Sequence, residues 1–224
     1  MAIEIALSGF LFLFVIITIT ASSQLGNKIT FGETDLDSDT LLQSIIDDPK
    51  RFRMSVYLAL IEHGSIIALA IVLFVAFGSY NLVLGSIWVV ARTVEGLILF
   101  VNEKNYWGLL NLAGRYSATS GDEKSVVSDL GLSTLRTKHH RFSFAQILFS
   151  IGTLGYTILF VTYGVVPAII GWFGLVSGII YGLGNVITAT KPENRVLAML
   201  GGLMIFLFEA VLGIWLLYSS FIIP

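Results

Sequence analysis

The sequence contains six apolar segments that are each long enough to cross a lipid bilayer. They cover about residues 3–21, 54–77, 82–101, 142–162, 166–188 and 196–223. A hydrocarbon layer of about 30 Å requires roughly 20 residues of α-helix, and lipid admits only helices or closed barrels because every backbone group must be satisfied. Runs this long and continuous favour helices. The sequence therefore predicts an all-α polytopic membrane protein, a six-transmembrane-helix bundle that forms one integral membrane domain over residues 1–224.

The composition agrees with this class of protein. Hydrophobic residues make up 55% of the chain and charged residues 12%, about half of the ~25% charged share of soluble domains. The net charge of −2 gives no reason to expect a nucleic-acid partner. There is no cysteine, which excludes disulfides, thiolate catalysis and cysteine-based metal sites. The expected partners are the lipid bilayer and, as an open alternative, another membrane protein or a second copy of the chain.

The Lys and Arg residues predict the orientation. All of them except Arg92 lie in the connecting segments 22–53, 102–141 and 189–195. The positive-inside rule places these three segments in the cytoplasm and both termini outside, in a multi-pass protein of the cell membrane. A cleaved signal peptide is the alternative for the first segment, but Glu4 and the lack of a basic residue before the apolar run disfavour it.

The segment 22–53 contains a short amphipathic pattern over residues 38–48, with apolar residues on one helical face. We expect a helix that is capped by Ser38 or Asp39, ended by Pro49, and lying on the cytoplasmic membrane surface. The acidic cluster around Asp35, Asp37 and Asp39 is interpreted as a solvated helix N-terminus. Cation binding is its alternative function.

The segment 102–141 is the largest predicted polar part. Residues 106–112 are expected to continue the third spanning helix or to lie at the membrane interface, where aromatic residues gather. Residues 117–123 predict a flexible break, and residues 124–140 predict a second amphipathic helix that Gly131 interrupts. His139 and His140 are interpreted as an interfacial anchor. Neither long connecting segment has a core of its own.

Small residues recur in the fifth apolar segment. Gly174, Gly178 and Gly182 are spaced by four residues, an interval that lets two helix backbones approach closely. Helix packing within the chain is the favoured interpretation, and a dimerisation face is the alternative.

Five ionisable side chains lie inside the apolar segments, where a charge costs about 2.5–3.5 kcal/mol on insertion scales. Arg92 and Glu95 are three residues apart and therefore within pairing reach on one helix. Glu62 lies 17 residues before Ser79, in the predicted turn, and Glu95 lies 16 residues after it, so antiparallel helices bring them to one height. We expect His63 to face another helix, and Glu209 to join only if the sixth helix packs beside the second and third. The candidate binding residues are Glu62, His63, Arg92, Glu95 and Glu209.

Three carboxyls and one guanidinium cannot all ionise cheaply in a low dielectric, so at least one Glu is expected to hold a proton or a cation. One hypothesis is a proton, ion or ligand site in a carrier or sensor. A polar staple in an accessory subunit is the second hypothesis, and an intramembrane lipid-modifying enzyme is the third. The sequence has neither GxSxG nor HExxH, so no catalytic residue and no cofactor is assigned, and a metal stays open. Tyr181 and Asn185 are expected as hydrogen-bonding neighbours.

Several short motifs resemble one family. They are Phe52-Arg53 before the second span, residues 92–96 with the sequence RTVEG, a tight turn followed by Pro167, and Phe208-Glu209 followed by LGIWLL at residues 212–217. Together they resemble the bacterial and archaeal membrane proteins grouped as domain of unknown function 4386, over nearly the whole chain. The resemblance implies a prokaryotic protein with about six spans and marks Arg92, Glu95 and Glu209 as family-pattern positions. It implies no activity.

Overall fold

The computed structural model describes residues 2–25, 37–191 and 194–222. Its helices are α1 (Ala2–Gln24), α2 (Ser38–Asp47), α3 (Pro49–Phe77), α4 (Leu82–Trp107), α5 (Leu109–Ala118), α6 (Gly121–Tyr163), α7 (Ala168–Thr190) and α8 (Val196–Ser220), with a 3-10 turn over Gly78–Tyr80. No strand occurs in these ranges. Six of the helices, α1, α3, α4, α6, α7 and α8, are long and apolar enough to span a membrane. The predicted all-α fold with six spans is therefore confirmed.

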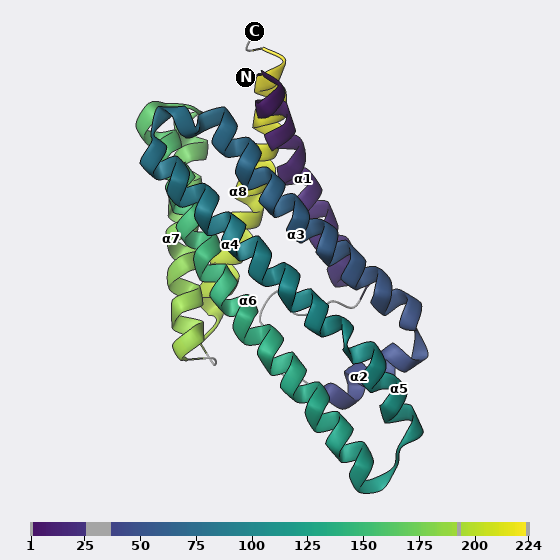
Figure 1. Ribbon diagram of the computed structural model, residues 1–224. Helices are drawn as coiled ribbons and strands as arrows, with labels where there is room; N and C mark the ends of the chain where they lie inside the picture. The colour runs from purple at the N-terminus through teal and green to yellow at the C-terminus, as the bar shows by residue number, and fades with distance from the viewer. Residues whose placement is uncertain (1, 26–36, 192–193, 223–224) are drawn as a thin grey trace.

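The six spanning helices form a closed ring. Going round the ring, α1 packs against α3, α3 against α4, α4 against α6, α6 against α7, α7 against α8, and α8 against α1 (Figure 1). The ring closes where α1 crosses α8. A Cβ added at Gly9 would lie 2.7 Å from both the Gly213 oxygen and the Leu217 nitrogen, so only glycine permits this backbone approach.

Both termini lie at one end of the molecule, which we call the terminal end (Figure 1). The apolar core near this end contains a chain of aromatic rings. Trp88 and Tyr156 meet edge to face with centroids 4.4 Å apart, and Phe77 meets Phe160 at 5.3 Å. The indole Nε1 of Trp88 donates a hydrogen bond to the Ala70 carbonyl at 2.9 Å. Aromatic packing of this kind joins α3, α4 and α6, and the Arg92 guanidinium borders it, 5.7 Å from the centre of the Trp88 ring.

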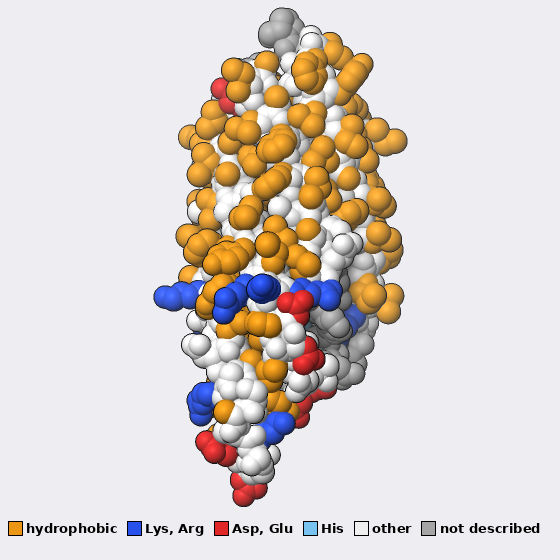
Figure 2. Space-filling view, turned by 90° about the vertical axis from the view of Figure 1, so that its right-hand side faces the viewer, with side chains coloured by type: hydrophobic (Ala, Val, Ile, Leu, Met, Phe, Trp, Pro, Cys, Tyr) orange, Lys and Arg blue, Asp and Glu red, His pale blue; other side chains and the backbone are white. Residues whose placement is uncertain are grey.

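The opposite end carries a polar appendage made of α2, α5 and the first half of α6. Figure 2 shows hydrophobic side chains over the spanning part, then a belt of Lys and Arg, and then the appendage. Leu42 and Ile45 of α2 are fully buried, in a cluster that includes Leu109 and Val127. The two long connecting segments therefore share one core, although neither was expected to have a core alone.

Three details of the appendage differ from the sequence-based expectation. Helix α2 packs its apolar face against the apolar faces of α5 and α6, so protein covers the face that was expected to meet the membrane. Its N-cap is Asp37, which accepts hydrogen bonds from the backbone of Asp39 and Thr40. Helix α6 continues through Gly131, which lies against Leu42 and gives α2 room to approach.

The remaining boundaries are close to those expected. Helix α4 does continue to Trp107, and the break before α6 is limited to Thr119 and Ser120. Pro49 is the first residue of α3, directly after α2 and Asp48. Lys28, Asp35 and Ile223, which entered the expectations for orientation, the acidic cluster and the last span, lie outside the described residues.

Candidate functional site

A cavity of about 150 Å³ lies inside the ring, in the half nearer the Lys/Arg belt, and all six spanning helices contribute to its wall. One water occupies about 30 Å³ of the liquid, so the cavity has room for several waters or one small molecule. Its polar and ionisable lining residues include Glu62, His63, Arg92, Glu95, Asn102, Glu103, Lys138, Gln146, Tyr181 and Glu209.

Arg92 and Glu95 form an ion pair on one face of α4. The Nη1 of Arg92 donates to the Glu95 Oε2 at 2.8 Å, and both side chains are only 2% exposed. The guanidinium lies over the Phe149 ring at 4.3 Å. On α6, a Cβ at Gly152 would come within 2.8 Å of the Arg92 side chain, so this glycine provides the space that the arginine occupies.

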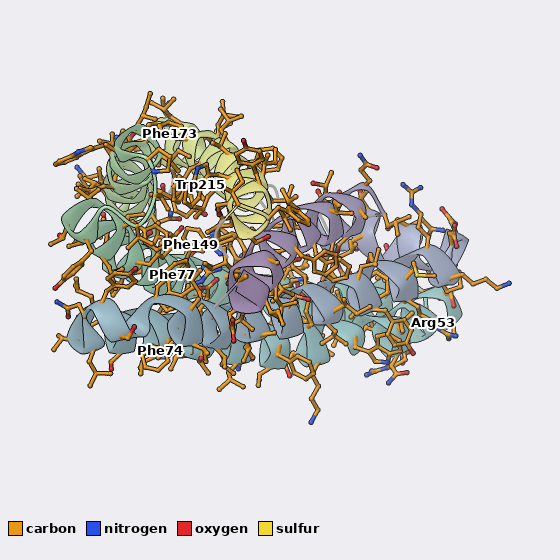
Figure 3. The ribbon with its side chains drawn as sticks, turned by 90° about the horizontal axis from the view of Figure 1, so that it is seen from above. Arg53, Phe74, Phe77, Phe149, Phe173 and Trp215 are labelled. Carbon is orange, nitrogen blue, oxygen red and sulfur yellow. The ribbon has the colours of Figure 1, made fainter. Side chains whose placement is uncertain are left out.

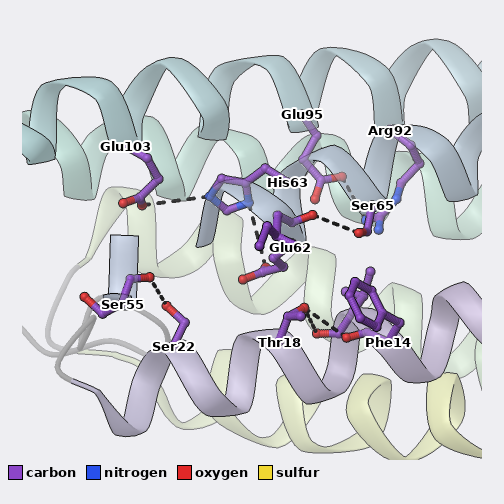
Figure 4. Close-up of polar contacts among 12 residues, drawn as sticks. Phe14, Thr18, Ser22, Ser55, Glu62, His63, Ser65, Arg92, Glu95 and Glu103 are labelled. Atoms are coloured by element: carbon purple, nitrogen blue, oxygen red, sulfur yellow. Dashed lines mark hydrogen bonds and ion pairs between the residues drawn. The ribbon is translucent and has the colours of Figure 1, made fainter. Parts of the chain in front are cut away.

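A second polar group lies closer to the belt (Figure 4). The Nδ1 of His63 is 3.8 Å from the Glu62 Oε1, and its Nε2 is 3.8 Å from the Glu103 Oε1. The Nζ of Lys138, on α6, is 2.9 Å from the same Glu103 oxygen. His63 thus faces α4, and the two acids on either side of it come from α3 and α4.

Glu209 reaches the cavity from the other side of the ring. The sequence predicts that Glu209 joins the other acids only if α8 packs beside α3 and α4. Helix α8 instead packs chiefly against α7 and α1, and Glu209 reaches the cavity from there. The Glu209 carboxyl lines the same cavity as Glu62 and Arg92. Within the described part of the chain it makes no ion pair and no hydrogen bond.

The sequence analysis missed Asn102, Glu103, Lys138 and Gln146 as cavity residues. A signal for Asn102 was present, because residues 92, 95, 99 and 102 follow helical spacing along one face of α4 and all four line the cavity. Glu103 and Lys138 were assigned to a connecting segment, since they lie just beyond the apolar runs. Both are buried, at 3% and 4% exposure.

The other residues singled out in the sequence are Tyr181, Asn185, three glycines of α7, and the pair His139 and His140. The hydroxyl of Tyr181 donates to the Gln146 Oε1 at 2.6 Å, whereas Asn185 donates to the Tyr181 backbone. Gly178 and Gly182 face side chains of α6, and Gly174 faces Phe208 of α8 and Thr157 of α6. These glycines therefore have packing partners within the chain. His139 and His140 are not among the residues that line the cavity.

The cavity wall contains polar atoms whose hydrogen-bonding capacity is unused. Among the described residues, buried atoms without a hydrogen-bond partner include both ring nitrogens of His63, the Arg92 Nε, the Asn102 Oδ1 and the Glu103 Oε2. Buried polar atoms without partners are rare in native proteins. These five belong to lining residues, and others lie on Arg141, Thr153 and Tyr156, which do not line the cavity. No group of three or more His, Asp or Glu among the described residues could hold a metal ion. The wall suits water, protons or a hydrogen-bonding molecule.

A family model described as Domain of unknown function (DUF4386) matches residues 7–219. The chain belongs to this family. The match includes every cavity-lining residue and nearly the whole six-helix ring. Searches of curated proteins and of solved structures found no match. The family brings no activity with it, so the argument for function starts from the cavity.

Proposed function

We propose that the protein is a carrier or sensor of the cell membrane that binds a proton or a small hydrogen-bonding cation in the cavity. Four carboxyls line it, those of Glu62, Glu95, Glu103 and Glu209, but only two permanent cations do. Arg92 pairs with Glu95 and Lys138 with Glu103. Ionised carboxylates without a partner are costly in a low dielectric, so the other two acids favour a bound proton or cation.

The single observation that carries this proposal is that neither Glu62 nor Glu209 has an Arg or Lys partner among the described residues, in a cavity wall that also contains unsatisfied polar atoms. A polar staple explains the pairs Arg92–Glu95 and Lys138–Glu103, because each is a close contact that joins or stiffens helices. A polar staple does not explain Glu62 and Glu209, two further acids that line the cavity. This difference favours a binding site over a purely structural layer.

The cavity also has a route for exchange. Thr20 of α1 and Phe206 of α8 line it and are exposed at the molecular surface. The two helices close the ring at Gly9 and Gly213, nearer the terminal end, and cavity residues of both helices lie on the belt side of that crossing. We therefore propose that a small ligand enters between α1 and α8, a route that leaves the packed terminal half unopened.

Proton binding is tested with the double variant Glu62→Gln/Glu209→Gln, in detergent or in lipid nanodiscs. Between about pH 5 and 8, wild-type protein should take up one to two more protons than the variant, and its melting temperature should depend more strongly on pH, because a shifted titration is linked to stability. Glu123→Gln, at an exposed position of the appendage, is the matched control. Equal proton uptake by wild type and double variant would contradict the proposal. Proton flux into proteoliposomes separates a carrier from a sensor.

The proposed orientation, with the belt in the cytoplasm and both termini outside, follows from the positive-inside rule. The chain has no cysteine, so a single cysteine reports its own location. Ser79 is exposed in the turn between α3 and α4, and Ser125 is exposed in the appendage. The two variants are therefore Ser79→Cys and Ser125→Cys. A membrane-impermeant thiol reagent added to intact cells should label the first and not the second. The reverse labelling pattern would mean that the belt lies outside the cell and both termini lie in the cytoplasm.

A further inference from the structure

We infer that His63 passes protons between Glu103, at the end of the cavity near the Lys/Arg belt, and Glu62, deeper in the same cavity. This inference rests on the proposed function and adds the route by which the cavity is protonated. His63 is 6% exposed, and neither of its ring nitrogens has a hydrogen-bond partner among the described residues. Each nitrogen instead faces a different carboxyl, at 3.8 Å. A structural histidine is normally fixed by at least one hydrogen bond.

The arrangement has a direction along the membrane normal. Glu103 and Glu95 are eight residues apart on α4, which separates them by about 12 Å along the helix. Glu103 lies next to the exposed Lys104, close to the belt, whereas Glu95 lies deeper in the spanning part. His63 links the outer acid to Glu62, as the dashed contacts in Figure 4 show. The three side chains therefore form a path within the cavity, from its end near the belt to its deeper part.

The proton transfer balances without an electron carrier. The O–H bond of a protonated Glu103 breaks as an N–H bond forms at the His63 Nε2. The Nδ1–H bond then breaks as an O–H bond forms on the Glu62 carboxylate. The histidine ends as the other neutral tautomer, and it returns by the reverse transfer or by turning its ring. A separation of 3.8 Å closes to hydrogen-bonding distance with a shift of about 1 Å.

The surroundings of His63 fit this role. The Oε1 of Glu103 lies near both the Lys138 Nζ and the His63 Nε2, while its Oε2 is buried without a hydrogen-bond partner among the described residues. A proton that arrives on Oε2 reaches the His63 Nε2 when the carboxyl group turns about its Cγ–Cδ bond. On α1, the facing wall supplies Thr20, Ser22 and Ser23, none of which titrates. The charged or titratable groups that line the cavity with His63 are Glu62 on α3, Arg92, Glu95 and Glu103 on α4, Lys138 on α6, Tyr181 on α7 and Glu209 on α8.

The test is a pH jump on the full chain in nanodiscs, with the infrared carboxyl band as the readout. His63→Ala should slow protonation of the cavity acids about 100-fold, as expected for loss of a positioned proton donor, and leave the final extent unchanged. Added imidazole should restore the rate, which a merely structural residue would not allow. Gly64→Ala is the neighbouring control, because a Cβ there meets nothing within 4 Å.

The outcomes of this experiment test the relay and the proposed function separately. Slow uptake that imidazole accelerates supports the relay. An unchanged rate in His63→Ala, or a slow rate that imidazole does not raise, overturns it while leaving proton binding intact. Should His63→Ala fail to fold, the wild type is compared in H₂O and D₂O, where the relay requires slower uptake in D₂O and an equal rate overturns it. Absence of any carboxyl protonation in the wild type contradicts the proposed function itself.

Discussion

The two halves of the ring are built from the same six helices but packed in opposite ways. Near the terminal end, Gly9 and Gly213 bring α1 and α8 into backbone contact, and a core of apolar and aromatic side chains fills the interior. Figure 3, seen from above, shows Phe77 of this core directed into the bundle. Nearer the belt, α1 and α8 lie apart (Figure 1) and a polar cavity occupies the space between the helices.

This contrast separates stability from binding. A close-packed apolar half holds the helices together chiefly through dispersion and small-residue contacts. The half with the cavity contains ionisable groups that are expensive to bury and are retained where they pair or bind a ligand. We therefore expect substitutions in the terminal half to change stability, and those at unpaired cavity acids to change binding.

The largest expected effect comes from breaking a pair inside the cavity half. Glu95→Gln leaves the Arg92 guanidinium buried without its 2.8 Å partner, which costs about 3–5 kcal/mol of unfolding free energy. Glu209→Gln changes the same functional group at an acid that has no pair, so its cost should stay within about 0.5 kcal/mol. Reversible unfolding in detergent measures both. Similar losses for the two variants would show that Glu209 has a structural partner.

The next effect is expected at the helix crossing of the terminal half. In Gly9→Ala, the new Cβ meets backbone atoms of α8 at 2.7 Å, which cannot turn away as a side chain can. Overpacking of this kind costs about 1–3 kcal/mol. Gly64→Ala makes the same change where the space is open and should leave the melting temperature unchanged or slightly raised. Equal stability of the two variants would mean that the crossing is loose.

A smaller effect is expected for the indole hydrogen bond in the terminal half. Trp88→Phe removes the donor to the Ala70 carbonyl and should lower the unfolding free energy by about 1 kcal/mol. Trp172→Phe, at a side chain 55% exposed on α7, is the matched control and should be neutral. Proton uptake should be unaffected by either change. An altered uptake in Trp88→Phe would show that the two halves are coupled.

The smallest effect is expected outside the membrane, at the N-terminus of α2. A hydrogen bond from the Thr40 hydroxyl lowers the pKa of Asp37 below its usual value. Its contribution to stability is therefore present above the ordinary Asp pKa and is lost as the pH falls through the lower, folded-state pKa. The protection factors of α2 amides against hydrogen exchange, which correct for the intrinsic pH dependence of exchange, should fall over that acidic window in wild type and should already be lowered at neutral pH in Asp37→Ala. Protection factors independent of pH in that window would exclude the cap.

Much of the architecture was predictable because it depends on local properties. An apolar run of sufficient length predicts a spanning helix wherever it occurs, and the three-residue spacing of Arg92 and Glu95 predicts a contact on one helix. The short helix at residues 38–47 was also predictable from its pattern. Its cap and its surroundings were not, because Asp37 was one of several residues able to cap, and its apolar face suits protein or membrane equally.

The sequence by itself determined the six crossings, the concentration of basic residues at one end and the presence of Glu62, His63, Arg92, Glu95 and Glu209 inside apolar segments. Only the tertiary structure decided that the helices form a ring, that Glu209 meets the others across a cavity, and that Glu103 and Lys138 are buried beside His63. Burial of these last two depends on which helix faces which. A residue just beyond an apolar run looks like an interfacial residue until a neighbouring helix covers it.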